Sequence, residues 1–179
     1  MDARENSYVA LLRGINVGTA KSVSMAELAG VFGRLGFSGV KTLLRSGNVV
    51  FEAGGALPAD AGSVIEAAVL ADTGVQASVL VLDAAAFIAI ADANPLAGVA
   101  TDGSKSFVTF LGATPGDIDL PDADALLPEV LRLGDGAIYQ WFPDGSLQSK
   151  VPKSFWKQFT APVTARNANT VAKIVALLE

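Results

Sequence analysis

Residues 8–18 of the chain are YVALLRGINVG, and residues 23–37 are VSMAELAGVFGRLGF. The continuous apolar run YVALL is typical of a central strand that is buried on both faces. Ser24 and Glu27 then form the capping-box pattern that begins a helix. Apolar residues recur with helical spacing up to Gly36, where the helix is expected to end. This stretch therefore predicts a buried strand followed by an amphipathic helix.

The elements that follow complete the first half of the chain. We expect a hairpin, a helix and a strand at residues 40–51, 58–72 and 75–82. The order strand, helix, strand, strand, helix, strand is that of the ferredoxin-like plait, in which two helices cover one face of a four-stranded antiparallel sheet. The sequence therefore predicts a first alpha-beta plait over residues 1–82.

The second half of the chain repeats this order less clearly. Asp83 is expected to cap a linking helix, and further strands are expected at residues 106–111, 130–133, 138–142 and 162–165. Helices are expected at residues 123–127 and 154–159 and around residues 171–178. The halves share no direct sequence repeat, so the duplication rests on element order alone. The predicted fold class is α+β: two ferredoxin-like (alpha-beta plait) subdomains in tandem with a C-terminal helix, with a linking helix and loop at 83–105 and the second plait at 106–179.

The composition of the chain excludes several kinds of catalysis. Its 179 residues include no histidine and no cysteine. These two absences exclude a Ser-His-Asp triad, a cysteine nucleophile, disulfides, thiolate-bound zinc and iron–sulfur clusters. The common glycine-rich nucleotide-binding motifs are also missing. The sequence predicts no metal and no cofactor, and it leaves open whether the protein is an enzyme.

The net charge of −5 is distributed unevenly along the chain. Residues 1–82 carry −1, residues 83–149 carry −8 and residues 150–179 carry +4. Overall acidity disfavours nonspecific binding to nucleic acid or to anionic membranes, whereas the basic C-terminal segment leaves room for a local anion site. No apolar stretch is long enough to span a bilayer, and the N-terminus lacks the apolar core of a secretion signal. A cytoplasmic protein without membrane attachment is expected.

Three segments share the pattern Arg-x-x-Asn, and they begin at Arg13, Arg45 and Arg166. Arginine supplies a forked, permanent cation and asparagine supplies both a donor and an acceptor, a pairing suited to phosphate, carboxylate or a base edge. In a plait, the end of the first strand and the turn between strands two and three lie at the same sheet edge, so the first two segments are expected to meet. The third is expected at the start of the last helix, where free amides favour an anion. The candidate ligand-binding residues are Arg13, Asn16, Arg45, Ser46, Asn48, Arg166, Asn167 and Asn169.

Each of these segments also has a purely structural interpretation. Gly14 can be a strand bulge and Asn16 a turn residue, Ser46-Gly47-Asn48 can be only a hairpin turn, and Asn167 or Asn169 can be only a helix N-cap. Turns and caps do not explain the three arginines, so we favour a functional cluster.

Two other groups of residues are interpreted as structural. The aspartates at 117, 119, 122 and 124 have a spacing that could hold Mg²⁺ or Ca²⁺, but the glycine and glutamate of an EF-hand loop are absent, so a solvated acidic loop is favoured. Lys150, Lys153 and Lys157 with Phe155 and Trp156 could form a basic–aromatic patch, but an amphipathic helix explains them equally well and is favoured.

The chain resembles the bacterial family known as domain of unknown function 1697. The resemblance is carried by YVALLRGINVG, by the helix over residues 25–37, by SGNVVF at residues 46–51 and by TARNANTVAKI at residues 164–174. It implies a tandem alpha-beta plait fold and no established biochemical activity. Thr19 stands where the family usually has a second glycine, and Ala168 where it usually has tryptophan. The missing aromatic residue weakens any role in stacking on a base or ring.

These observations lead to three functional hypotheses. The first is that the protein binds a small anionic ligand, phosphorylated or nucleotide-like, at the Arg/Asn cluster. The second is a single-stranded nucleic-acid-binding module, since plaits often present a sheet to RNA, although the net charge of −5 and the lack of an RNP1-type run oppose it. The third is an interaction protein that forms a homodimer through a sheet face or edge.

Overall fold

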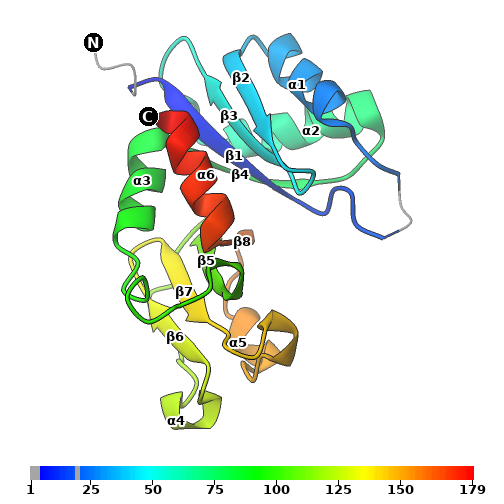
Figure 1. The fold of residues 1–179 in the computed structure, drawn as a ribbon. Helices are drawn as coiled ribbons and strands as arrows, with labels where there is room; N and C mark the ends of the chain where they lie inside the picture. Colours follow the sequence, from blue (N-terminus) through cyan, green and yellow to red (C-terminus); the bar gives the residue numbers. More distant parts are fainter. Residues whose placement is uncertain (1–4, 19–20) are drawn as a thin grey trace. The chain divides into compact units, whose positions relative to one another are not determined.

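The computed structural model describes residues 5–18 and 21–179, so that Thr19 lies outside the described residues. The chain divides into two compact units, one made of Met1–Ile88 with Ile174–Glu179 and the other of Ala89–Lys173. Each unit contains one four-stranded antiparallel sheet (Figure 1). The predicted α+β class with two tandem alpha-beta plaits and a C-terminal helix is confirmed.

The first unit has the element order predicted for a plait. Its elements are β1 (Ser7–Arg13), α1 (Met25–Arg34), β2 (Ser38–Leu43), β3 (Asn48–Glu52), α2 (Ala61–Thr73), β4 (Ser78–Asp83) and the start of α3 (Ala84–Asp92). The sheet order is β2-β3-β1-β4, which makes β1 and β3 the central strands. The loop after β1 and the β2–β3 turn are therefore neighbours at one edge of the sheet.

Local hydrogen bonds explain where the first two helices begin and end. The Ser24 hydroxyl accepts from the Glu27 amide at 3.1 Å and the Glu27 carboxylate accepts from the Ser24 amide at 2.8 Å, which is the predicted capping box of α1. Helix α2 begins at Ala61 rather than at the predicted Pro58, because Pro58 to Ala61 form a turn closed by a 3.0 Å bond. It ends at Thr73, and the predicted stop residue Gly74, with a φ of 70°, is its C-cap.

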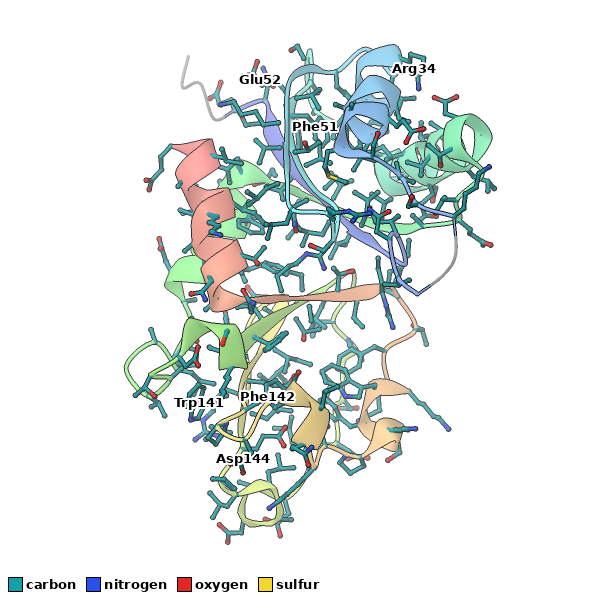
Figure 2. All side chains as sticks on the ribbon, turned by 45° about the vertical axis from the view of Figure 1, so that its right-hand side comes forward. Arg34, Phe51, Glu52, Trp141, Phe142 and Asp144 are labelled. Carbon is teal, nitrogen blue, oxygen red and sulfur yellow. The ribbon has the colours of Figure 1, made fainter. Side chains whose placement is uncertain are left out.

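The core of the first unit lies between the sheet and helices α1 and α2. Strand β1 is buried on both faces, with Ala10 and Leu12 in this core and Val9 and Leu11 on the opposite face. Burying a large apolar side chain stabilises a fold by about 1.5–3 kcal/mol, so the apolar run of β1 makes a large contribution. An ion pair between Arg34, labelled in Figure 2, and Asp72 joins α1 to α2 at 2.7 Å.

The second unit is a plait with much shorter helices. Its elements are η1 (Gly103–Lys105), β5 (Ser106–Leu111), α4 (Ala123–Leu126), β6 (Val130–Leu133), β7 (Ala137–Trp141), η2 (Ser146–Gln148), α5 (Lys153–Trp156), β8 (Val163–Asn167) and the start of α6 (Ala168–Leu178). The sheet order is β6-β7-β5-β8, the same arrangement as in the first unit. One core cluster of this unit contains Leu111, Leu126, Leu131, Ile138 and Phe155.

Two element boundaries in the second unit differ from the sequence prediction. Strand β8 continues past residue 165 to Asn167, because Arg166 and Asn167 pair with Val108 and Phe107 of β5. Arg166 is therefore a strand residue and does not belong to the last helix. Helix α5 ends at Trp156 rather than at residue 159, and the chain continues in turns.

Within the part of the chain that the structure describes, no helix combines sufficient length with sufficient apolar character to span a membrane.

Candidate functional site

The Asn16 side chain joins the loop after β1 to the β2–β3 turn. Its amide nitrogen donates to the Arg45 carbonyl oxygen at 2.8 Å and to the Val23 carbonyl oxygen at 3.0 Å. Its amide oxygen accepts from the Val23 backbone nitrogen at 2.8 Å. The first two Arg-x-x-Asn segments therefore meet, as the plait topology predicted. We call residues 13–17 and 44–48 together the paired loops.

Gly47 allows the two loops to approach closely. It has a φ of 93°, and a Cβ atom at this position would lie 2.7 Å from Ile15 Cδ1 and 2.8 Å from Leu12 Cβ. The Leu12 amide also donates to the Gly47 carbonyl oxygen at 2.8 Å. Only glycine fits both the backbone conformation and the space.

Asn48 is a buried part of the turn. Its side chain is 1% exposed, and its amide nitrogen donates to the Leu43 carbonyl oxygen at 2.8 Å and to the Ser46 hydroxyl oxygen at 3.2 Å. Ser46 itself is exposed. Because its oxygen accepts from Asn48, the orientation of the Ser46 hydroxyl is restricted and its O–H points away from that amide.

The paired loops present two exposed cations and two exposed apolar side chains. Arg13 ends β1 and Arg45 lies in the β2–β3 turn, and both are exposed. Val17 is 61% exposed and Leu44 is 45% exposed. The sequence analysis identified the arginines but missed Val17 and Leu44, because strand periodicity alone treats Leu44 as the next inward residue of β2.

Backbone conformation in the paired loops is unusual at two positions. Among the described residues, Asn16 and Leu44 are the non-glycine residues with positive φ, at 53° and 59°. Asparagine tolerates the left-handed region, whereas leucine does so rarely because its Cβ crowds the following carbonyl oxygen. The Asn16 side chain donates to the carbonyl oxygen of Arg45, the residue that follows Leu44.

The third Arg-x-x-Asn segment belongs to the second unit. Arg166 is only 9% exposed, and burial lowers the pKa of its guanidinium to about 10. Asn167 accepts from the Thr170 amide at 2.9 Å and so caps α6, which is the structural role considered for it. Asn169 lies against Gly103, where any Cβ atom would collide with its side chain. This segment is therefore built into the packing of its own unit.

Glu129 is a buried acidic residue that the sequence analysis missed. It is 6% exposed, and its carboxylate accepts from the Ser149 hydroxyl at 2.8 Å, from the Lys150 amide at 2.8 Å and from the Gln140 side chain at 3.4 Å. These bonds fix the loop after β7, on which Figure 2 labels Phe142 and Asp144. Glu129 also lines a small hollow together with Phe142 and Asp144. A single glutamate before a short strand carries no sequence signal for such a role.

The acidic segment at residues 117–124 has structural hydrogen bonds. The Asp119 backbone exchanges two hydrogen bonds with the Gln158 side chain, at 2.8 and 3.0 Å, and the Asp122 carboxylate caps α4. Among the residues that the structure describes, no group of three or more acidic side chains is arranged to hold a metal ion.

The basic–aromatic segment is also largely structural. Phe155 is 3% exposed and packs in the core of the second unit, with Trp156 and Phe159 against it. The Lys150 ammonium donates to the Leu127 carbonyl oxygen at 2.6 Å. The favoured interpretation as a structural, amphipathic segment agrees with these contacts.

Comparison with known proteins identifies the family. Residues 6–139 match the family described as "Protein of unknown function (DUF1697)". The chain belongs to this family. A conserved bacterial protein from Streptococcus pneumoniae, whose structure is solved, is similar to it over 97% of this chain and 99% of that chain, with 26% sequence identity and a TM-score of 0.67. No curated protein matches the chain.

The DUF1697 match covers some of the candidate residues and not others. It includes both paired loops and ends before Arg166. The resemblance noted from the sequence is confirmed, and the DUF1697 family itself has no assigned function. The family therefore assigns no activity to the residues of the paired loops.

Proposed function

We propose that the paired loops bind a small anionic ligand, phosphorylated or nucleotide-like, through Arg13 and Arg45. The observation that carries this proposal is the hydrogen bond from Asn16 to the Arg45 carbonyl oxygen, which joins the two loops that bear the arginines. Both arginines are exposed cations. Loops that are already held together lose less conformational entropy on binding, which favours affinity.

The residues of the paired loops have distinct roles in this proposal. Arg13 and Arg45 supply the forked donors that recognise phosphate or carboxylate oxygens. The Ser46 hydroxyl oxygen accepts from Asn48, which leaves its O–H available as a further donor. Asn16 and Asn48 are positioning residues, because their side chains are already used within the loops.

Binding is favoured over chemistry by the groups that are present. Arginine, serine and asparagine recognise anions well, but they are poor proton-transfer catalysts near neutral pH. The third segment is not part of the proposed site, because Asn167 caps α6 and Arg166 is a buried strand residue.

Isothermal titration calorimetry with inorganic phosphate, pyrophosphate and nucleoside mono- and diphosphates tests the proposal. Loss of a charge-assisted hydrogen bond costs about 1.5–3 kcal/mol, so Arg13→Ala and Arg45→Ala should each weaken binding by roughly ten- to a hundredfold. Lys41→Ala is the matched control, because Lys41 is an exposed cation on the same hairpin but outside the paired loops. No binding of any of these anions, or equal affinities in all variants, would contradict the proposal.

No observation favours the nucleic-acid alternative. In the first unit, the aromatic side chains of the central strands are turned into the core: Tyr8 is 8% exposed, Phe51 is 0% exposed, and their rings stack at 5.7 Å. Neither ring offers a platform on which a base could stack. The sheet-mediated homodimer stays a prediction, which light scattering over a range of protein concentrations tests.

A further inference from the structure

Leu44 occupies a position where neither the backbone nor burial favours leucine. Its φ of 59° lies in the left-handed region, and its side chain is 45% exposed. Glycine or asparagine would adopt this backbone conformation with less strain. An exposed leucine also gains little from the hydrophobic effect on folding. Stability therefore does not explain why leucine stands here, and strained positions of this kind cluster at binding sites.

Val17 is an exposed apolar residue on the other of the paired loops, the loop after β1. It is 61% exposed and directly follows Asn16, whose side chain donates to the carbonyl oxygen of Arg45, the residue after Leu44. Each of the paired loops therefore carries one exposed arginine and one exposed apolar side chain. A single exposed apolar residue is ordinary, but here two of them lie on loops that are hydrogen-bonded to each other.

We propose that the ligand of the paired loops is an amphiphilic organic anion. Its phosphate or carboxylate head would be held by Arg13 and Arg45, and its apolar group would contact Val17 and Leu44. This inference rests on the proposed function and names the chemical class of its ligand. A compact inorganic anion uses only the arginines, whereas an amphiphilic anion uses all four exposed side chains.

The ligand that fits is a soluble molecule rather than a lipid in a bilayer. Stable attachment to a membrane requires a larger apolar insertion or a cluster of basic residues in addition. The paired loops offer two apolar side chains and two arginines, and the chain carries a net charge of −5, which opposes approach to an anionic surface.

A series of alkyl phosphates tests the inference. Calorimetric titrations would compare inorganic, methyl, butyl and hexyl phosphate with the full chain, below the concentration at which the longer compounds form micelles. Transfer of one methylene group out of water is worth about fourfold in affinity, so affinity should rise by up to that factor per methylene until the apolar surface is covered. Phosphatidylglycerol vesicles are the membrane arm of the test.

Three variants separate the apolar surface from the arginines. Leu44→Asn and Val17→Thr should leave the affinity for inorganic phosphate unchanged and lower the affinity for butyl phosphate by roughly tenfold, about the loss of one to two buried methylene groups. Leu70→Asn is the matched control, because Leu70 is 48% exposed but lies on α2. Leu44→Asn relieves backbone strain and so should fold, and Val17→Thr keeps the shape of the side chain.

Each result supports or overturns the inference. Chain-length dependence that disappears in Leu44→Asn and Val17→Thr but not in Leu70→Asn supports it. Arginine-dependent phosphate binding without any effect of chain length overturns it and leaves the proposed function intact. Binding to vesicles without binding of butyl phosphate overturns the soluble class of ligand. Absence of binding by every anion overturns both proposals.

Discussion

At the residue scale, Gly47 determines how closely the paired loops approach. Gly36 has a similar φ of 87°, but a Cβ atom added there would have no other atom within 4 Å. A substitution at Gly36 therefore measures backbone strain alone, without the steric contact that a substitution at Gly47 adds. We expect Gly36→Ala to cost about 1–2 kcal/mol from the backbone alone. Gly47→Ala should cost roughly 2–4 kcal/mol, because its Cβ also meets Ile15 and Leu12. Urea unfolding measures the free energy of unfolding of both variants. Equal losses in Gly36→Ala and Gly47→Ala would contradict the close approach of Gly47 to Ile15 and Leu12.

Leu44 leads to a prediction of the opposite sign. Leu44→Asn should raise the free energy of unfolding by about 1 kcal/mol, because asparagine tolerates the left-handed region in which Leu44 lies. Leu44→Ala is the control and should not stabilise the fold, since alanine keeps the Cβ that causes the strain. Urea unfolding curves of both variants provide the measurement. A Leu44→Asn variant no more stable than the parent chain would show that the backbone is not strained there.

The residue scale also shows what the sequence could and could not predict about the site. The Arg-x-x-Asn pattern identified Arg13, Asn16 and Arg45, and the plait topology brought their loops together. The pattern could not show that Asn48 is consumed inside its turn or that Arg166 is buried in a strand, since both depend on three-dimensional neighbours. The φ of Leu44 likewise follows from the turn geometry and leaves no mark in the periodicity.

At the element scale, the capping box of α1 predicts a dependence of stability on pH. The backbone hydrogen bond from Ser24, followed by the Ser24 side-chain bond, lowers the pKa of Glu27 from its usual value of 4.5. The contribution of Glu27 to stability is therefore complete above about pH 4.5 and is lost as the pH falls through the lowered pKa. Stability should decline less steeply below that pH in Glu27→Gln than in the parent chain.

Urea unfolding midpoints at pH 7, 4 and 3 test this prediction. Ser24→Ala should lower the free energy of unfolding at pH 7 by about 1 kcal/mol, since it removes the N-cap acceptor. Glu5→Gln is the control, because Glu5 is exposed and lies outside α1. Parallel pH profiles for Glu27→Gln and the parent chain would contradict the capping-box contribution.

The start of α1 and the C-cap of α2 were predicted correctly, whereas the end of β8 was not, for a physical reason. The Ser24–Glu27 box and Gly74 act through bonds within a few residues, so that a local pattern is sufficient to place them. Strand β8 extends to Asn167 only because β5 provides partners more than fifty residues earlier in the chain. Local sequence contains no information about such a partner, and the predicted end of this strand was therefore too early.

At the scale of the whole molecule, element order predicted the duplication but not the placement of the last residues. The sequence showed two sets of strands and helices, and each set forms its own antiparallel sheet. Ile174–Glu179, however, belong to the first unit although they are the C-terminal end of the chain. The amphipathic pattern of α6 indicates that Ile174 and Leu178 are buried, but it does not identify the surface that buries them.

Because the chain end belongs to the first unit, substitution of Ile174 tests whether this end stabilises that unit. Ile174 is 0% exposed, so Ile174→Ala should lower the free energy of unfolding by about 2–5 kcal/mol, and Ile174→Val by about 0.5–1.5 kcal/mol. Hydrogen exchange should accelerate mainly in β1 and β4 of the first unit and less in β7 of the second, because Ile174 belongs to the first unit.

Lys173→Ala is the control for this experiment, because Lys173 is exposed on the same helix and alanine preserves helix propensity. Its exchange pattern should match that of the parent chain. Faster exchange in β7 than in β1 of Ile174→Val would place the chain end with the second unit and contradict the division. Since the paired loops begin where β1 ends, the milder Ile174→Val variant also shows whether loosening this strand weakens anion binding at Arg13 and Arg45.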